Sequence, residues 1–232
     1  MMALLLSIAI FASTEKTSMK DLPIVLQYRI SQNFGKDDSA YHIKKTDLGY
    51  TAVNHLNGLT GLISEKGMQV RVKGFTWSLL LKGFNSGGTC MPLNSMWDSV
   101  SLSDNKLEFR SHGFISWYIN GPLGIQQGWT LEKRLSGIGG FPSLCFEEEG
   151  DLSAGNVPEK GSSLTLASED GTIVLNYQGL YAYDARGKVI PAWFEKAGKH
   201  VFITLDDKDA ITTVPLLLKQ NQLVRKFRTQ LV

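Results

Sequence analysis

The sequence predicts an all-β protein, an enlarged antiparallel β-sandwich of roughly 14 strands. Three observations lead to this prediction. The chain of 232 residues is 43% hydrophobic and contains 5 Trp, 7 Tyr and 11 Phe, which is enough apolar material for a large core. From residue 24 onward it breaks into short β-rich runs separated by Gly, Asn, Asp or Ser. These runs outnumber the strands of a minimal sandwich, which has about seven.

Strands are predicted where apolar and polar residues alternate, because one face of such a strand contacts solvent. This pattern occurs at residues 24–30, 68–72, 106–110, 163–166 and 201–205. Two further runs, at residues 76–81 and 114–119, are more continuously apolar, so we expect them in the centre of a sheet. Few windows show the spacing of an amphipathic helix.

Two hairpins follow from turn sequences that contain glycine. The turn Glu169-Asp170-Gly171 joins residues 163–167 to residues 172–177. The turn at residues 184–187 joins residues 180–183 to residues 188–194. In both turns a glycine stands where a positive φ is needed, which is the usual reason for glycine in a tight hairpin.

Residues 22–218 are predicted to form one β-sandwich domain, because no long Pro- or Ser-rich linker interrupts them. The segment 137–158 is the best candidate for an internal boundary, since it combines two adjacent glycines with the acidic run Glu147-Glu148-Glu149. We interpret residues 147–151 (EEEGD) as a solvated loop rather than a paired-carboxylate site, because adjacent residues of an extended chain point to opposite faces.

Residues 1–21 are predicted to be a signal peptide and a polar connector. The apolar run at residues 3–12 has the length of a signal-peptide core and is too short to span a bilayer. A secreted or cell-surface location follows from this interpretation. The alternative is a disordered start, with residues 15–21 as a polar connector.

Residues 219–232 are predicted to form a basic tail outside the core. Before it, residues 214–218 should pair as the last strand. Within residues 220–232, apolar residues recur at helical spacing, which favours a short amphipathic helix: Leu223, Val224, Phe227 and Leu231. The formal net charge of the whole chain is only +2, and four of the basic residues lie in this tail, so no basic field indicates a nucleic-acid partner.

No catalytic, metal or cofactor site is predicted. The chain has no G-x-S-x-G nucleophile motif, and its histidines are scattered: His42, His55, His112 and His200. Cys90 and Cys145 cannot form a metal cluster alone, and they are either one disulfide or two buried thiols. The aspartates at residues 206, 207 and 209 lack the spacing of a calcium loop. We therefore expect a protein that is not an enzyme.

The five tryptophans fall into two groups. Four lie in strand-like apolar runs and are expected in the core: Trp77, Trp117, Trp129 and Trp193. Trp97 lies in the loop-like segment 91–99 and is the one candidate for an exposed platform that stacks on a sugar ring.

One stretch is more specific than composition, namely FISWYINGPLGIQQGWTL at residues 114–131. It resembles the W-Y-x-N-G-P-L-G-x-x-Q-G-[FW]-T-L segment in the amino-terminal module of bacterial exported proteins that carry FG-GAP, integrin-alpha-like repeats. Residues 35–42 are similar to the G-x-D-D-x-x-Y-H of that module, and residues 177–192 to its Y-x-G-L-x-x-x-D-x-x-G-x-x-x-P-A. The matching residues of the central segment include Trp117, Tyr118, Asn120, Gly121, Pro122, Gly124, Gln127, Gly128 and Trp129.

The resemblance covers roughly residues 30–215 and implies a non-catalytic, exported or cell-surface module with a structural or interaction role. Its partner is unknown, and a protein or a glycan at the cell surface would fit. The family has no catalytic residues to carry over, and its motif is expected to be structural, because glycines and prolines set turns and aromatic residues fill a core. Two alternatives remain. The second candidate is a glycan-binding β-sandwich. The third is a mutarotase-like enzyme, which would need a His and a carboxylate facing one concave sheet.

The sequence departs from that family near its carboxyl end. Residues 214–220 keep Pro215 and an apolar strand but lack the Asp-Pro that follows in the family and leads into the repeats. We therefore expect either a truncated relative without the repeats or a fragment of a longer ancestor.

Overall fold

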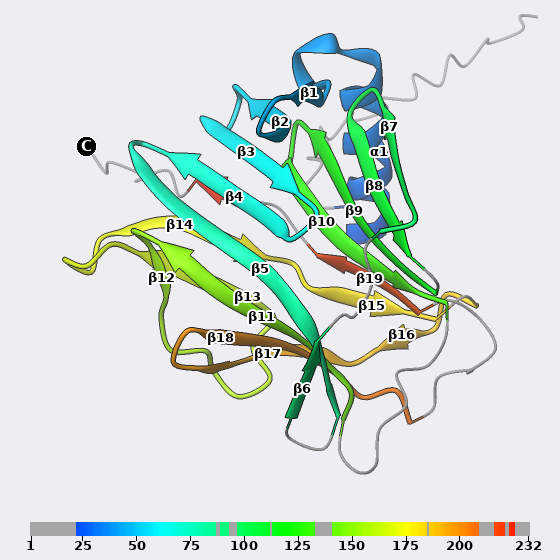
Figure 1. Ribbon diagram of the computed structural model, residues 1–232, viewed down its shortest axis with the longest axis vertical. Helices are drawn as coiled ribbons and strands as arrows, with labels where there is room; N and C mark the ends of the chain where they lie inside the picture. Colours follow the sequence, from blue (N-terminus) through cyan, green and yellow to red (C-terminus); the bar gives the residue numbers. More distant parts are fainter. Residues whose placement is uncertain are drawn as a thin grey trace, which may run out of the picture.

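A computed structural model describes residues 22–86, 89–92, 97–111, 113–132, 141–184, 186–208, 216–220 and 223–225. The expectations for residues 1–21 lie outside this part of the chain. The described residues form twenty strands, one α-helix and one short 3₁₀ helix, and every described strand pair is antiparallel (Figure 1). The predicted all-β antiparallel sandwich is confirmed.

The strands outnumber the roughly 14 expected because several are too short for an alternating pattern to show. Strands β12 (Ser153–Ala154) and β16 (Val189–Ile190) have two residues each, and β1 (Lys44–Thr46) has three. Such pieces take their extended conformation from a neighbouring strand rather than from their own sequence.

Three sheets build the sandwich. The largest has nine strands and combines the first six strands of the chain with three later ones. Its order is β1, β2 (Gly49–Asn54), β3 (Leu59–Ser64), β4 (Gly67–Val72), β5 (Phe75–Ser86), β11 (Ser143–Gly150), β18 (His200–Leu205) and β17 (Ala192–Ala197), with β6 (Thr89–Pro92) also paired to β5.

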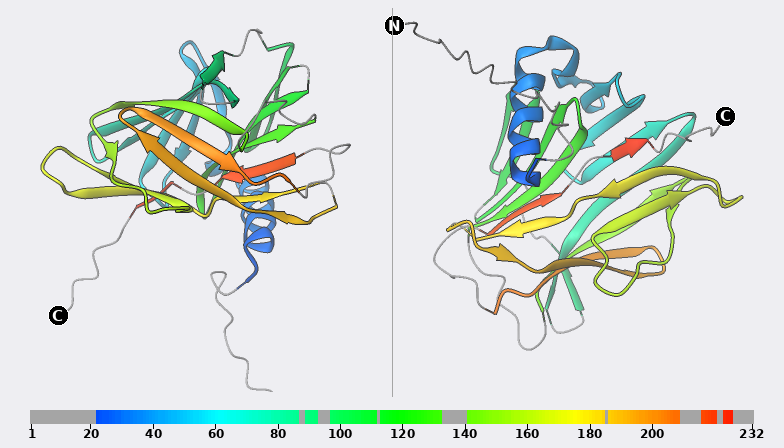
Figure 2. Two further views of the ribbon diagram at one scale, coloured as in Figure 1. Left: turned by 90° about the horizontal axis from the view of Figure 1, so that it is seen from below. Right: turned by 180° about the vertical axis from the view of Figure 1, so that it is seen from behind.

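The second sheet has seven strands in the order β16, β15 (Tyr181–Tyr183), β19 (Leu216–Gln220), β10 (Gly124–Leu131), β9 (Phe114–Gly121), β8 (Lys106–Ser111) and β7 (Ser99–Ser103). The third has four strands in the order β12, β13 (Ser163–Ala167), β14 (Ile173–Gln178) and β20 (Leu223–Arg225). Figure 2 shows these sheets from below and from behind.

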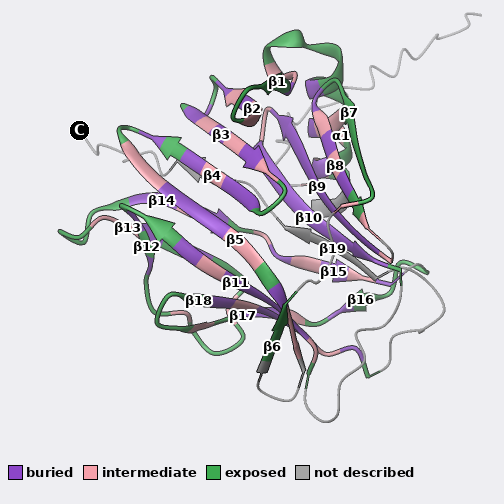
Figure 3. Ribbon diagram, viewed as in Figure 1, coloured by how far each residue is buried: buried purple, intermediate pink, exposed green. Residues whose placement is uncertain are grey.

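The hydrophobic core lies between the sheets, and aromatic rings join them. Trp129 of the second sheet packs on Phe146 of the first, with ring centroids 5.0 Å apart. Tyr177 of the third sheet meets Trp77 of the first at 5.4 Å. Figure 3 shows buried residues along the strands that face this interior. The prediction that Trp77, Trp117, Trp129 and Trp193 are core residues is confirmed, since each is at most 6% exposed.

Both predicted hairpins are present, as β13–β14 and as β15–β16. The two continuously apolar runs lie centrally, as expected. Strand β5 stands between β4 and β11, and β9 stands between β8 and β10. All eight residues of β9 are buried. One face of β9 meets the main core, and Ile115, Trp117 and Ile119 form a separate buried cluster on alternate residues.

The strand predicted at residues 24–30 is wrong, because these residues begin helix α1 (Ile24–Asp37), which packs against β9. Its buried face is made by Tyr28, Ser31 and Gly35, at spacings of three and four residues. Two of these are small or polar, so the helical period is missing from the apolar pattern. Leu26 and Phe34, which contributed to that pattern, are exposed.

The segment 137–158 is not a loop throughout. Its residues Ser143–Gly150 form β11, which pairs with β5 on one side and β18 on the other. Residues 133–140 lie outside the described part of the chain. A strand between two neighbours belongs to the continuous sheet, so β11 provides no linker in this segment.

The helix expected over residues 220–232 is wrong at Leu223–Arg225, which form β20 and pair with β14. Gln220 and the preceding Lys219 belong to β19, which lies between β10 and β15, so the predicted last strand is central rather than final. A short isolated helix is marginal in water, whereas the edge of β14 offers backbone groups to pair with. Residues 226–232 lie outside the described part.

Candidate functional site

The segment at residues 114–131 that the sequence analysis singled out forms the β9–β10 hairpin. Trp117, Tyr118, Asn120 and Gly121 lie in β9, and Gly124, Gln127, Gly128 and Trp129 lie in β10, joined by a turn at Pro122. Every one of these residues except Pro122 is buried.

Asn120 is the centre of a buried hydrogen-bond network, with 0% of its surface exposed. Its Oδ1 accepts a hydrogen bond from Asn54 Nδ2 at 2.8 Å. Its Nδ2 donates to the backbone oxygens of Tyr41 at 3.0 Å and Val53 at 2.9 Å. The amide thereby fixes the end of β9 to β2 and to the short 3₁₀ helix Ser39–Tyr41.

Two further asparagines complete this network. Asn54 Nδ2 also donates to Gly121 O at 2.8 Å, and Asn54 Oδ1 accepts from the side chain of Asn57 at 2.9 Å. Asn105 Nδ2 donates to Asn120 O and, at 3.0 Å, to Gln32 O in α1. These buried amides hydrogen-bond to one another and to backbone groups. Such hydrogen bonds compensate for the water that a buried polar group loses.

Close backbone contacts explain the glycines of this junction. A Cβ on Gly121 would lie 2.5 Å from Ser31 O in α1, and a Cβ on Gly128 would lie 2.1 Å from the Trp117 ring. On the helix side, a Cβ on Gly35 would lie 2.3 Å from Asn120 O. We call the packed set of α1, the asparagine network and the β9–β10 turn the helix–turn junction.

Replacing Gly35 with alanine should therefore destabilise the protein by about 1 to 3 kcal/mol, the usual cost of overpacking. At an exposed helix position the same change would stabilise by up to about 1 kcal/mol. Denaturant unfolding of Gly35→Ala measures the effect, and Asn33→Ala, at an exposed position of the same helix, is the matched control. A Gly35→Ala midpoint equal to or above that of the parent would contradict this packing.

Gln127 extends the buried polar structure between two sheets. Its Nε2 donates to Tyr118 Oη at 3.2 Å, and its Oε1 accepts from Tyr177 Oη at 3.0 Å. Burial raises the pKa of Tyr118 to about 12 and also raises the pKa of Tyr177, so both phenols remain protonated at neutral pH. Apart from Pro122, the motif residues are thus buried in packing contacts and hydrogen bonds between the sheets.

A buried ion pair lies elsewhere, on the first sheet. Glu148 in β11 is 4% exposed, and its Oε1 lies 2.6 Å from Lys196 Nζ in β17. Its Oε2 accepts from Trp77 Nε1 at 3.2 Å and from the backbone N–H of Ala154 at 2.9 Å. The interpretation of residues 147–151 as a solvated loop is wrong, because residues 147–150 belong to β11 and the alternation of that strand turns Glu148 inward.

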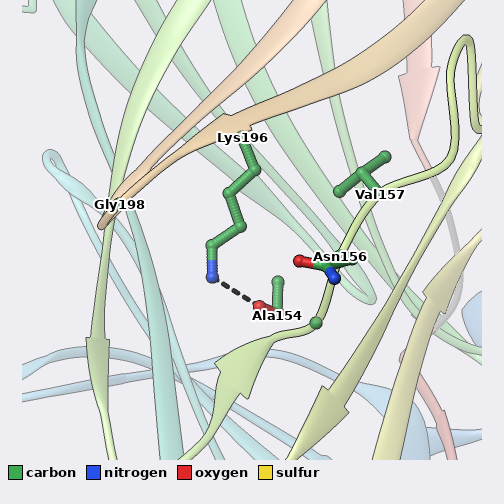
Figure 4. Close-up of a pocket in the computed structure, with 6 residues that line it drawn as sticks. Ala154, Asn156, Val157, Lys196 and Gly198 are labelled. Carbon is green, nitrogen blue, oxygen red and sulfur yellow. Dashed lines mark hydrogen bonds between the residues drawn. The ribbon is translucent and has the colours of Figure 1, made fainter.

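A pocket of about 450 Å³ opens beside this ion pair. It is lined by Ala154, Gly155, Asn156, Val157, Lys196 and Gly198. Figure 4 shows the Lys196 side chain reaching across to Ala154, whose backbone oxygen accepts from Nζ, while Asn156 and Val157 stand on the adjoining loop. The lining is polar and carries no net charge when Glu148 is counted with Lys196.

The Lys196 ammonium group carries three N–H donors, and two of them contact Glu148 and Ala154 among the described residues. The third is available to a ligand oxygen, and the Asn156 amide adds both donors and an acceptor. Sequence reasoning missed this pocket. Glu148 lies far from Lys196 in the chain, and only the β11–β18–β17 order of the sheet brings them together.

Trp97 is not the freely exposed platform that its loop position predicted. It is half-buried and packs against the main core, with its ring stacked on Phe114 at 5.8 Å between centroids. Its Nε1 donates to Glu65 O at 2.9 Å. One ring face is therefore covered by protein, and the residue does not line the pocket beside Lys196.

The three described histidines lie on separate elements: His42 follows the 3₁₀ helix, His55 lies in the turn between β2 and β3, and His200 begins β18. His55 and His200 are exposed, and the ring of His42 hydrogen-bonds to Lys36 O. His200 stands opposite Glu147 in the β11–β18 ladder, but that carboxylate is paired with Lys82 at 2.6 Å. The Lys82 hydrogen bond and charge lower the pKa of Glu147. His112 lies outside the described residues.

The described residues contain neither a group of side chains suited to a metal ion nor a helix suited to crossing a membrane. No three His, Cys, Asp or Glu side chains in this part of the chain gather closely enough to hold a metal ion. Helix α1 falls short of the length and apolarity needed to cross a membrane, and the described residues contain no other α-helix. The chain matches no protein-family model, and neither a curated protein nor a solved structure matches it.

Proposed function

We propose that this chain is a non-catalytic, exported or cell-surface β-sandwich module with a structural or interaction role, of the kind that precedes FG-GAP repeats. The helix–turn junction is the observation that carries this proposal. Asn120, Gly121 and Gly128 are buried where side chains or backbone segments meet, so the motif stabilises a fold and presents no reactive group. A motif whose residues serve packing is consistent with a module that acts through its surface rather than through a catalytic centre.

A domain-exchange experiment tests this role. The chain replaces the amino-terminal module of an FG-GAP repeat protein, and the chimera is produced in a bacterial host that exports the parent. We expect the chimera to reach the cell surface and to resist protease there as the parent does. Degradation equal to that of the repeat domain without any module would refute the proposal.

Glycan binding is the second candidate, and the pocket beside Lys196 is the observation that favours it. A volume of about 450 Å³ is within the range of small-ligand sites. Sugars present many hydroxyl groups, each of which both donates and accepts hydrogen bonds. The free donor of Lys196 and the amide of Asn156 match such groups without a net charge. Stacking on Trp97 is not needed for this mode.

Replacing Asn156 with alanine should weaken glycan binding by roughly tenfold, as expected when one or two hydrogen bonds of about 1 kcal/mol each are lost. Asn156 is exposed and lines the pocket, so stability should not change. A glycan array selects the probe, and calorimetry compares the parent with Asn156→Ala. Asn33→Ala is the control amide, far from the pocket. Equal affinities in parent and Asn156→Ala would exclude this pocket as the glycan site.

A further inference from the structure

Strand β7 lies at one edge of the second sheet, and no strand of the described part of the chain pairs with its outer side. It pairs with β8 along residues 99–103, and the sheet ends there (Figure 1). All five residues of β7 are exposed, as the green ribbon in Figure 3 shows. A strand at a sheet edge leaves part of its backbone N–H and C=O groups unpaired, so it can accept one more strand.

The other described edge strands carry features that discourage pairing. Charged side chains, proline and short length all hinder the addition of a strand. Strand β1 has Lys44 and Lys45, β17 has Glu195 and Lys196, and β6 ends at Pro92. Strands β12 and β16 have two residues each, and β20 has three. Among the described edges, β7 alone combines a length of five residues with a sequence free of charge and proline.

The two faces of β7 differ in chemistry. Val100 stands opposite Phe109 in β8. Leu102 stands opposite Leu107, and both of these β8 residues are buried in the main core. Residues opposite each other point to the same face, so Val100 and Leu102 extend the core face of the sheet to its edge, where each is 39% exposed. The three serines of β7 lie on the other face. The edge therefore presents two apolar side chains that a further strand would cover.

The sequence of β7 is complementary to itself. It reads SVSLS, so a two-fold axis at Ser101 places Val100 opposite Leu102 of a second copy and serine opposite serine. Apolar pairs opposite each other stabilise a sheet, whereas like charges opposite each other destabilise it. The five residues bring no charge to this pairing. At its two ends Asp98 of one copy approaches Asp104 of the other, and salt screens that repulsion. A second copy is therefore the partner that this strand fits.

We propose that the β7 edge is a self-association surface, on which a second copy of this chain adds its own β7 in antiparallel register about a two-fold axis at Ser101. The second sheets of the two copies then form one continuous sheet, in which Val100 of each copy pairs with Leu102 of the other. Five residues from each copy make a small interface compared with the roughly 20 to 30 of a standard one, so the dimer is weak and reversible.

Sedimentation velocity of the full chain measures this association. Protein concentrations from about 10 μM to about 1 mM cover the range in which weak dimers form. We expect the average mass to rise from that of a monomer toward that of a dimer as the concentration increases. Added salt should strengthen the association, because it screens the aspartates at the two ends of the strand pair.

Ser101→Lys should weaken the association by at least about tenfold, because it places two lysines opposite each other at the axis. Ser101 is exposed and stands opposite Glu108 in β8, so the melting temperature should not fall. Ser153→Lys is the matched control. It makes the same change at an exposed serine of β12, another edge strand, and should associate as the parent does.

A charge exchange tests the register. Ser101→Glu should also lose self-association, whereas an equal mixture of Ser101→Lys and Ser101→Glu should form a heterodimer at least as readily as the parent dimerises. Opposite charges then meet at the axis.

Three results would overturn the proposal. A parent that stays monomeric throughout would leave the β7 edge to a strand of another protein. If Ser101→Lys associates as the parent does, the interface lies elsewhere, for instance at the exposed Leu26 and Phe34 of α1. A mixture of the two charged variants that stays monomeric would exclude the register about Ser101.

Discussion

Replacing Trp129 with alanine is expected to lower the free energy of unfolding by about 3 to 5 kcal/mol, the usual cost of removing a buried tryptophan. Trp129 is fully buried in β10, and its ring packs on Phe146 of the opposing sheet. The substitution would leave a cavity at the contact between the first and second sheets. Chemical denaturation followed by circular dichroism measures the loss. Circular dichroism is used because the substitution removes a tryptophan and so changes the fluorescence of the protein.

Trp129→Phe is the matched control for this prediction. The indole N–H donates to no partner among the described residues, so phenylalanine keeps most of the ring contact without sacrificing a hydrogen bond. Its loss of stability should be clearly smaller than that of Trp129→Ala. Denaturation midpoints that are equal in the parent and Trp129→Ala would mean that the ring is exposed, which would strengthen the glycan-binding alternative.

The second large effect is expected at Glu148. Glu148→Ala should destabilise the protein by about 3 to 5 kcal/mol, the range seen when one partner of a buried ion pair is removed. The change leaves the Lys196 ammonium without its carboxylate and removes the acceptor of Trp77 Nε1. Thermal and denaturant unfolding near neutral pH measure the loss.

Two further variants define the source of this loss. Glu149→Ala alters the adjacent, exposed glutamate and should change stability by no more than about 0.5 kcal/mol. The double variant Glu148→Gln with Lys196→Met removes both charges and should recover part of the stability lost in Glu148→Gln alone. If Glu148→Ala behaves like Glu149→Ala, the carboxylate is solvated and the described ion pair does not contribute to stability.

The central strands and hairpins could be predicted from the sequence because their signals are local. In β9 five of the first six residues are apolar or aromatic, and both faces of that strand are buried. The turn ending at Gly171 has a positive φ of 80°, as the Asp-Gly sequence requires. Such features depend on residues within one strand or one turn, so no knowledge of distant contacts is needed.

The candidate site could not be predicted, and the reason is equally physical. The acidic run containing Glu148 looks like a hydrophilic loop until β17 supplies Lys196 and β5 supplies Trp77. The sequence pattern also failed to predict helix α1, because the buried face of this helix includes Ser31 and Gly35 rather than a row of apolar residues. Their burial makes sense only against the backbone of the β9–β10 turn.

By itself the sequence determined the all-β class, the antiparallel hairpins and the core positions of four tryptophans, because alternation and turn residues act over a few neighbours. The tertiary structure alone decided that residues 24–37 are helical, that Leu223–Arg225 form a strand, and that Glu148 faces Lys196. Each of these depends on contacts between segments distant in sequence, where packing and hydrogen bonding override the local pattern.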